Sequence, residues 1–392
     1  MKEIGSIFPW PLSRPSDPLS PNGEGEVSNP PLLKPSQAIK GNIFLAPWGE
    51  DARRVGEGHL SFCREAIYLI ASHELSHGKK AMLPKYTCDT VIAPFQELGY
   101  DYQFYPVCKD LTIDIPKAKE IFSVHHPNLI VVHPYFGMDL TKQEQDMLEE
   151  IHEDGCEIIL DLTQCLFSTM RLPFIKYYVG SIRKWFAIPD GAFLETNEEM
   201  QMPTIGNNEI VSLQTKAMQL RGEYFQTVDT NVKDESIRLS HEVERLMTRP
   251  ITPHIMASIS KELLAFENVD IQQKIRIENY KRLYEGLKNV KDIELIADIS
   301  RLTTAPLFFP FRVKNIQEMQ RKLAQKSIYA RLIWEEEDRI LTITVDQRYD
   351  LADMDRVIAA IKEKSDSDVG PLQVRFKSHS SPIPEKGERV DS

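Results

Sequence analysis

Four short segments of the chain combine charged, small polar and aromatic side chains in ways that could support chemistry. In the first, Asp161 follows the apolar run 156–160, and Gln164 comes three residues later. In the second, Ser181 precedes Lys184 by three residues, and a Pro-Asp-Gly turn follows. A carboxylate at a strand end can hold a heterocyclic nitrogen protonated. A lysine in a fixed loop can form a Schiff base once its ammonium group is deprotonated.

The other two segments offer groups that could bind a phosphate and a flat ring. "SFCREAIYLI" (61–70) reads as a turn that opens an apolar helix, with Cys63 and Arg64 at its start. "LPKYTCDT" (83–90) places Tyr86 just beyond a predicted strand. A helix N-terminus binds phosphate well, and an aromatic side chain can stack on a ring. Together the four segments meet the requirements of pyridoxal phosphate (PLP), an electron sink that a protein must orient and protonate.

These segments must be positioned by the elements around them, and the pattern there is a repeated β-α-β. Strands are predicted at 79–84, 101–107, 128–136 and 156–163, and helices at 87–99, 111–124 and 141–155. Near-continuous apolar strands are typical of a parallel sheet that is covered by helices on both faces. Ligands of such sheets bind beyond the carboxyl ends of the strands, where Asp161 is expected.

The remaining pattern predicts a second, smaller α/β unit. Residues 208–290 read as mainly helical, and strand and helix patterns then alternate to residue 364. We therefore expect an α/β protein with a mostly parallel central sheet. The predicted parts are an irregular N-terminal arm (1–40), a large domain (41–265), a small C-terminal α/β domain (266–364) and a disordered tail (365–392).

One further motif, His73-Glu74-Leu75-Ser76-His77, fits the H-E-x-x-H pattern of zinc metalloproteases. The spacing would put both histidines on one helix face, but the predicted helix ends at Gly78, and Glu97 is the only simple candidate for a third ligand. Histidines near a helix C-terminus are also favoured by the helix dipole. A zinc hydrolase is therefore an alternative of lower rank, and no metal is expected.

Composition narrows the class of protein. The 392 residues carry a net charge of −11, which argues against nonspecific nucleic-acid binding. The five cysteines are an odd number without a C-x-x-C pair, which favours reduced thiols. No apolar run reaches transmembrane length, and the first residues lack a signal-peptide pattern. We expect a cytoplasmic protein that contacts neither membrane nor nucleic acid.

With these motifs placed, the chain resembles the fold-type-I PLP enzymes and, among them, the DegT-like family of (mostly sugar) aminotransferases. The resemblance runs from "KEIGSIF" near the start to "TITVDQRYDLADMDRVIAAI" near the end. "NLIVVHPYFG" is similar to a family strand and the segment after it, and "IENYKRLYEGL" to the domain-linking helix.

The resemblance implies roles for the candidate residues. Asp161 would pair with the pyridine nitrogen, Gln164 would lie near the phenolic oxygen, Ser181 would bind phosphate, and Lys184 would form the internal aldimine as the catalytic residue. The turn at Phe62-Cys63-Arg64 would give backbone N–H groups to the phosphate, although the family usually has Gly with Ser or Thr there. The cofactor-binding residues expected in this way are Cys63, Arg64, Tyr86, Asp161, Gln164, Ser181 and Lys184.

The resemblance also implies a function and a partner. The expected reaction is PLP-dependent transfer of an amino group from an amino-acid donor to a keto sugar or related metabolite, in a homodimer. A PLP-dependent lyase or dehydratase on the same scaffold, or a non-catalytic PLP-fold protein, are the alternatives. Arg331 and Arg348 are candidates for binding a substrate carboxylate.

Overall fold

A computed structural model describes residues 58–334 and 338–363. The predicted N-terminal arm and C-terminal tail lie outside the described residues. Two sheets with separate hydrophobic cores organise the described chain. No helix of the described residues is long and apolar enough to cross a membrane.

The larger sheet has seven strands in the order β1-β7-β6-β5-β4-β2-β3. β7 is antiparallel to both of its neighbours, and the remaining pairs are parallel. The prediction of a mostly parallel sheet is therefore confirmed. The strands are β1 (Gly58–Leu60), β2 (Lys80–Pro84), β3 (Asp101–Tyr105), β4 (Leu129–Val132), β5 (Glu157–Asp161), β6 (Tyr177–Ser181) and β7 (Ala192–Thr196).

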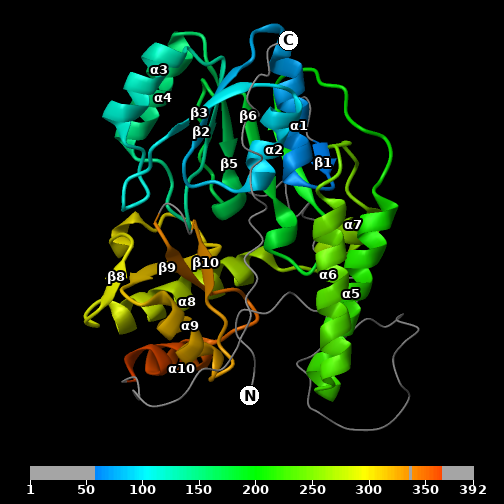
Figure 1. Cartoon of the computed structure of the whole chain (residues 1–392), viewed down its shortest axis with the longest axis vertical. Coiled ribbons are helices and arrows are strands. Elements are labelled where there is room, and N and C mark those ends of the chain that lie inside the picture. The colour runs from blue at the N-terminus through cyan, green and yellow to red at the C-terminus, as the bar shows by residue number, and fades with distance from the viewer. Residues whose placement is uncertain (1–57, 335–337, 364–392) are drawn as a thin grey trace, which may run out of the picture. The chain divides into compact units, whose positions relative to one another are not determined.

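Helices cover both faces of this sheet, as Figure 1 shows. Alternate residues of one strand enter different cores, because successive side chains point to opposite faces. In β5, Ile158 and Leu160 pack with α3 and α4, whereas Ile159 packs with α1 and α2. These helices are α1 (Cys63–His73), α2 (Asp89–Glu97), α3 (Ile115–His125) and α4 (Lys142–Glu153), and the 3₁₀ turn η3 (Glu74–Ser76) follows α1.

Local signals fix where these helices begin and end. Thr141 and Glu144 form a reciprocal capping box at the start of α4. Asp114 accepts a hydrogen bond from the Lys117 N–H at the start of α3. Gly99 has a φ of +71° just after α2, a conformation that favours glycine.

The smaller sheet has four antiparallel strands in the order β10-β11-β9-β8 and its own core with three helices. The predicted C-terminal α/β architecture is present, while the exact domain boundary at 265/266 stays a prediction. The elements are α8 (Val269–Leu287), β8 (Ile293–Leu295), η6 (Ile299–Arg301), β9 (Phe308–Val313), α9 (Ile316–Ala324), β10 (Arg331–Ile333), β11 (Ile340–Thr344) and α10 (Leu351–Lys362).

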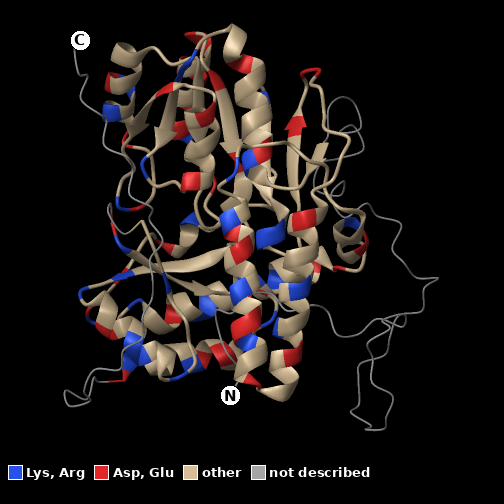
Figure 2. Ribbon diagram, turned by 45° about the vertical axis from the view of Figure 1, so that its right-hand side comes forward, with Lys and Arg blue, Asp and Glu red and all other residues tan. Residues whose placement is uncertain are grey.

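In the sequence between the last strand of the large sheet and the smaller unit, the chain forms a long helical hairpin. α5 (Asn208–Thr227) and α6 (Thr230–Leu246) lie side by side, and α7 (Ser258–Leu264) follows. Asn207 and Asp229 cap the two long helices, and Val228 turns the chain with a φ of +57°. Basic and acidic residues are intermixed along the hairpin (Figure 2), as expected for helices that expose much of their surface.

Candidate active site

A cavity of about 490 Å³ lies at the carboxyl ends of the central strands. Its walls come from the large sheet, from the smaller sheet and from the α5–α6 hairpin. All seven residues predicted to bind a cofactor line it: Cys63, Arg64, Tyr86, Asp161, Gln164, Ser181 and Lys184. The chain thus brings side chains that are up to about 120 residues apart in sequence into one cavity, while the roles assigned to them remain predictions.

Asp161 is the last residue of β5, and its carboxylate is buried at 3% exposure. The carboxylate accepts a hydrogen bond from the Thr163 N–H at 2.9 Å. His133 Nδ1 lies 3.5 Å from the other carboxylate oxygen, and the Cys63 thiol faces the first at 3.9 Å. These neighbours hold the carboxylate in place at the edge of the cavity.

His133 and Cys63 are both held in their neutral forms. Burial lowers the pKa of His133, against the opposing effect of Asp161. Burial, together with the charge of Asp161, raises the pKa of the Cys63 thiol well above its usual value. Cys63 is therefore a packing thiol rather than a nucleophile. The sequence signal for His133 is its place directly after the buried run 129–132, although its spacing from the other histidines fits no metal site.

Thr163 ties the ends of β5 and β6 together. Its hydroxyl oxygen accepts a hydrogen bond from the Ser181 N–H at 3.0 Å, and the Trp185 indole N–H donates to its carbonyl at 2.8 Å. Ser181 is the last residue of β6, and its side chain is buried beside the cavity. This bracing fixes the backbone on which both Ser181 and Lys184 are carried.

Lys184 ends the short 3₁₀ turn η5 (Ile182–Lys184). Its side chain is exposed to the cavity and forms no hydrogen bond or ion pair within the described part of the chain. The Trp185 carbonyl next to it accepts hydrogen bonds from Arg276 at 3.1 Å and from Gln347 at 3.0 Å. An amino group without a partner among the described residues, carried on a clamped backbone, could react with a carbonyl compound once it is deprotonated.

Gln164 ends the 3₁₀ turn η4 (Leu162–Gln164), and its Oε1 atom is buried without a hydrogen-bond partner among the described residues. A buried amide oxygen without a hydrogen-bond partner raises the free energy of the folded state. A bound polar group in the cavity would satisfy this amide.

The N-terminus of α1 also faces the cavity. Phe62 precedes the helix and gives it no side-chain cap, so the first N–H groups lack the usual partner. The Arg183 guanidinium lies 5.2 Å from the Phe62 ring and forms no ion pair with a described residue. Arg64 is buried at 8% exposure, and its Nε atom has no partner in the described chain. Burial lowers the pKa of both arginines, and each retains its positive charge at neutral pH.

Asp190, in the Pro-Asp-Gly turn, supports the start of α1 from behind. The Ser61 hydroxyl donates to its carboxylate at 2.8 Å, and the Ala257 N–H and the Ser260 hydroxyl donate to it as well. Gly191 has a φ of +145°, and a Cβ atom there would lie 2.9 Å from a Met256 methyl. The turn therefore needs glycine, and its Asp190 carboxylate ties the start of α1 to the segment 257–260.

Tyr86 is buried, and its ring stacks on Trp334 with centroids 5.1 Å apart and planes at 18°. Trp334 comes from the loop after β10, so this pair joins the two walls of the cavity. The proposed stacking of Tyr86 on a cofactor ring stays a prediction. Its partner Trp334 could not have been found from spacing, because 248 positions separate the two residues.

Solved structures identify the architecture around this cavity. A DegT/DnrJ/EryC1/StrS aminotransferase from Brucella abortus aligns with a TM-score of 0.56 at 14% identity, over 83% of this chain and 91% of its own. The sugar aminotransferase CalS13 from Micromonospora echinospora aligns with a TM-score of 0.57 at 13% identity, over 82% and 92%. A Streptococcus pneumoniae protein in its PMP form aligns with a TM-score of 0.57 at 12% identity, over 79% and 86%. The fold is that of the DegT-like aminotransferases.

The resemblance in sequence is far weaker than the resemblance in fold. No family model matches the chain, and no curated protein matches it by sequence. Within the DegT-like fold, the Phe62-Cys63-Arg64 turn still forms the N-terminus of a helix at the cavity. Two arginines, Arg64 and Arg183, lie at that N-terminus.

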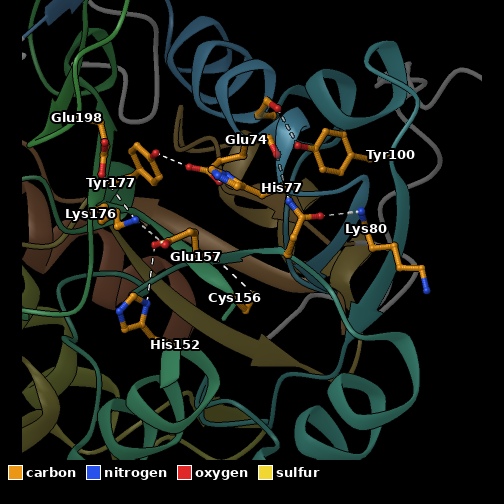
Figure 3. A network of polar contacts seen from close by, with 12 residues as sticks. Glu74, His77, Lys80, Tyr100, His152, Cys156, Glu157, Lys176, Tyr177 and Glu198 are labelled. Atoms are coloured by element: carbon orange, nitrogen blue, oxygen red, sulfur yellow. Dashed lines mark hydrogen bonds and ion pairs between the residues drawn. The ribbon is translucent and has the colours of Figure 1, made fainter. Parts of the chain in front are cut away.

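The H-E-x-x-H motif lies at the opposite end of the DegT-like fold, at the amino ends of the strands. α1 stops at His73, so the two histidines are not carried on one continuous helix. Glu74 points inward, where it accepts a hydrogen bond from the Tyr177 hydroxyl and lies 2.8 Å from His77 Nδ1 (Figure 3). No three His, Cys, Asp or Glu side chains of residues 58–334 and 338–363 are grouped to hold a metal ion. The buried Glu74 explains the motif, and the described residues around it do not form a ligand set for zinc.

Proposed function

We propose that this protein is a PLP-dependent aminotransferase that moves an amino group from an amino-acid donor to a keto sugar or a related metabolite. The observation that carries the proposal is the meeting of Asp161, Lys184 and the N-terminus of α1 at one cavity. The DegT-like fold supports it, as does the neighbour from Streptococcus pneumoniae that is known in PLP and PMP forms.

The residues of the cavity fit PLP. The uncapped α1 N-terminus with Arg64 and Arg183 would hold the phosphate, aided by Ser181. The buried Asp161 carboxylate would accept a hydrogen bond from the protonated ring nitrogen. Gln164 would lie near the phenolic oxygen, to which its Nε2 amide group, and not the unpartnered Oε1 atom, could donate.

The chemistry divides between the cofactor and the chain. PLP, when bound, supplies an electron sink for a carbanion next to the amino group. Asp161 keeps the ring nitrogen protonated, and the neutral His133 holds the Asp161 side chain in position. Lys184 Nζ accepts the proton that leaves the substrate carbon, because its side chain is exposed in the cavity and has no competing partner among the described residues.

A homodimer in the cytoplasm completes the proposal. The dimer rests on the resemblance to the DegT-like family. The cytoplasmic location is supported by the five cysteines, Cys63, Cys88, Cys108, Cys156 and Cys165, all of which are free thiols.

The decisive experiment is a near-ultraviolet and visible spectrum of the protein purified with PLP, for the wild type and for Lys184→Ala. Lys79→Ala, which changes an exposed lysine outside the cavity, is the matched control. After borohydride reduction, mass spectrometry should find the cofactor attached at Lys184 in the wild type and in the control. Zinc is measured on the same samples.

An absorption band in the wild type and in Lys79→Ala that is lost in Lys184→Ala supports the proposal. The amino donor is then found by following how candidate amino acids change the band. A colourless wild type that retains no PLP after dialysis would overturn the proposal, whatever its zinc content.

A further inference from the structure

An aromatic cluster forms the part of the cavity wall where the two sheets meet. The large sheet contributes Tyr86, Tyr135 and Phe136 from the loops that follow its strands, and the loop after β10 contributes Trp334. Tyr86, Phe136 and Trp334 also line the cavity. The cluster therefore belongs both to the contact between the sheets and to the candidate site.

The Trp334 ring lies against three aromatic rings of the large sheet. It stacks on Tyr86 with centroids 5.1 Å apart and planes at 18°, meets the Tyr135 ring edge-on at 5.4 Å and lies 5.9 Å from the Phe136 ring. Stacked and edge-to-face pairs are the arrangements that aromatic rings prefer, and they favour one orientation of each ring. The contact is thus specific in its geometry and not only apolar.

The backbone at Trp334 is held in an unfavourable conformation. Its φ is +48°, which a bulky residue rarely adopts. The Trp334 carbonyl accepts hydrogen bonds from the Asp338 N–H at 3.0 Å and from the Arg339 N–H at 2.9 Å, which hold it there. Strained backbone is concentrated at binding and catalytic sites, so the conformation points to a role for the Trp334 side chain at the cavity.

A polar contact fixes the same loop against the large sheet. Arg312 on β9 pairs through Nε with the Asp338 carboxylate at 2.9 Å, and its Nη2 atom donates to the Lys109 carbonyl at 2.7 Å. Lys109 lies beyond the carboxyl end of β3. Arg312 is buried, so solvent and salt screen this pair only weakly. Aromatic and charged contacts together therefore fix the position from which the indole reaches Tyr86.

We propose that Trp334 is a positioning residue: it packs on one face of the Tyr86 ring and so fixes the plane in which the opposite face stacks on the PLP ring. This inference rests on the proposed function, since it gives Tyr86 a contact with the same cofactor. The Tyr135 hydroxyl supports the arrangement by donating to the Tyr86 carbonyl at 2.8 Å. A ring that is already held in one plane loses less conformational freedom when a ligand stacks on it, and this favours binding.

The assignment predicts that the two side chains act as a pair. Loss of Trp334 frees the Tyr86 ring, and loss of Tyr86 removes the surface through which Trp334 acts on PLP. Either substitution should then have little effect once the other has been made. Two side chains that contacted PLP independently would instead give effects that multiply.

The test is a double-mutant cycle on PLP binding. Each dialysed protein is titrated with PLP, and the absorption band and its circular dichroism at full occupancy are followed. The cycle consists of the wild type, Tyr86→Leu, Trp334→Leu and the double variant, and Trp334→Phe is the conservative variant. Phe104→Leu is the matched control, because it breaks an edge-to-face pair with Tyr102 at 5.6 Å on β3, away from the cavity lining. Thermal midpoints are recorded for every sample.

We expect Trp334→Leu to bind PLP roughly 3- to 10-fold more weakly, as for the loss of one aromatic pair, and to lose part of the dichroism of the band. Tyr86→Leu should bind PLP at least as weakly, and the double variant should match Tyr86→Leu. Trp334→Phe should retain most of the affinity, because it keeps a ring that can stack. Phe104→Leu should match the wild type in affinity and in dichroism.

Two results would overturn the inference. One is an unchanged PLP affinity and dichroism in Trp334→Leu, and the other is an equal loss of affinity from Trp334→Leu with and without the Tyr86 ring. If Trp334→Leu does not fold, the cycle is read with Trp334→Phe, whose smaller effect must likewise vanish in the Tyr86→Leu background.

These results leave the proposed function standing, because the absorption band of the wild type is read in the same series. A wild type without that band overturns the proposed function instead, and this inference with it.

Discussion

The two ends of the large sheet are both rich in charged side chains, but they use them differently. At the amino ends, the charges satisfy one another: Tyr177 donates to Glu74, and Lys176 lies 2.6 Å from Glu157 and 3.6 Å from Glu198 (Figure 3). At the carboxyl ends, Lys184 has no such partner among the described residues.

The charged residues that stabilise the fold therefore lie at one end of the sheet, and those that are available for function lie at the other. Paired polar groups in a buried network lower the free energy of the folded state, and a lone charge at a cavity contributes little to it. A lone charge is available to a ligand, however. Substitutions at the two ends should therefore affect different properties, and the predictions below test this from the largest effect to the smallest.

The largest effect is expected at the carboxyl end from Asp161→Asn. The amide cannot hold a ring nitrogen protonated, so the transamination rate should fall by roughly 10²- to 10⁴-fold. Steady-state kinetics with the amino donor found for the wild type measures the change. The free energy of unfolding should change by less than about 1 kcal/mol, because Asn can still accept the hydrogen bond from the Thr163 N–H. An unchanged rate would show that Asp161 does not keep the ring nitrogen protonated.

Glu74→Ala, at the amino end, should lower the stability of the protein and leave its activity unchanged. The substitution leaves the Tyr177 hydroxyl without its acceptor and opens space beside a side chain that is 1% exposed. We expect a loss of about 2–3 kcal/mol in the free energy of unfolding, measured by urea denaturation. The PLP band and the half-reaction with the donor should be unaffected. A large loss of activity in the folded variant would contradict the separation of the two ends.

The buried carboxyl group of Glu65 on α1 predicts that the free energy of unfolding depends on pH. Burial raises the pKa of this α1 carboxyl from 4.5 to about 8, although the His254 N–H donates to it at 3.1 Å. The folded state thus favours the protonated acid, and this contribution to stability is complete below about pH 4.5 and lost as pH rises through about 8. Glu65→Gln should flatten the fall in the free energy of unfolding over this window, by up to about 1.4 kcal/mol per pH unit. Identical pH slopes for the two proteins would contradict the raised pKa.

The smallest effect is expected where charges are paired but fully exposed. Arg238 on α6 pairs with Glu235 at 2.7 Å, and both side chains are open to solvent. Arg238→Ala should leave the denaturation midpoint and the PLP band unchanged within error, because solvent screens such pairs. A clear destabilisation would show that ion pairing stabilises this protein even without burial. The stability of the network around Glu74 would then not require that network to be buried.

Much of this arrangement could be predicted from the sequence. The apolar run before Asp161 predicted both its strand and its position at a carboxyl end. Both predictions depend on local pattern, which the chain carries within a few residues. The mostly parallel sheet followed from the same runs, and the structure confirms it.

Other features depend on contacts between distant segments and left no local signal. The stacking of Tyr86 on Trp334 arises only when the smaller sheet meets the larger one, because 248 positions separate the two residues. The helical pattern of α5 and α6 gave no indication that Gln214 would reach the cavity. The contact of His133 with Asp161 likewise joins the ends of two strands, and the spacing of a lone histidine does not indicate it.

The position of the α5–α6 hairpin affects how the substrate range of the protein can evolve. Its base contributes Gln214, Met218, Ser240 and Glu244 to the cavity, while Phe225 and Val228 at its far end are exposed. The groups proposed to hold the cofactor lie on other elements, so the hairpin can accumulate substitutions that change which substrates are accepted without disturbing the reacting lysine. Exchange of this one segment between related enzymes would be a short route to new substrate ranges.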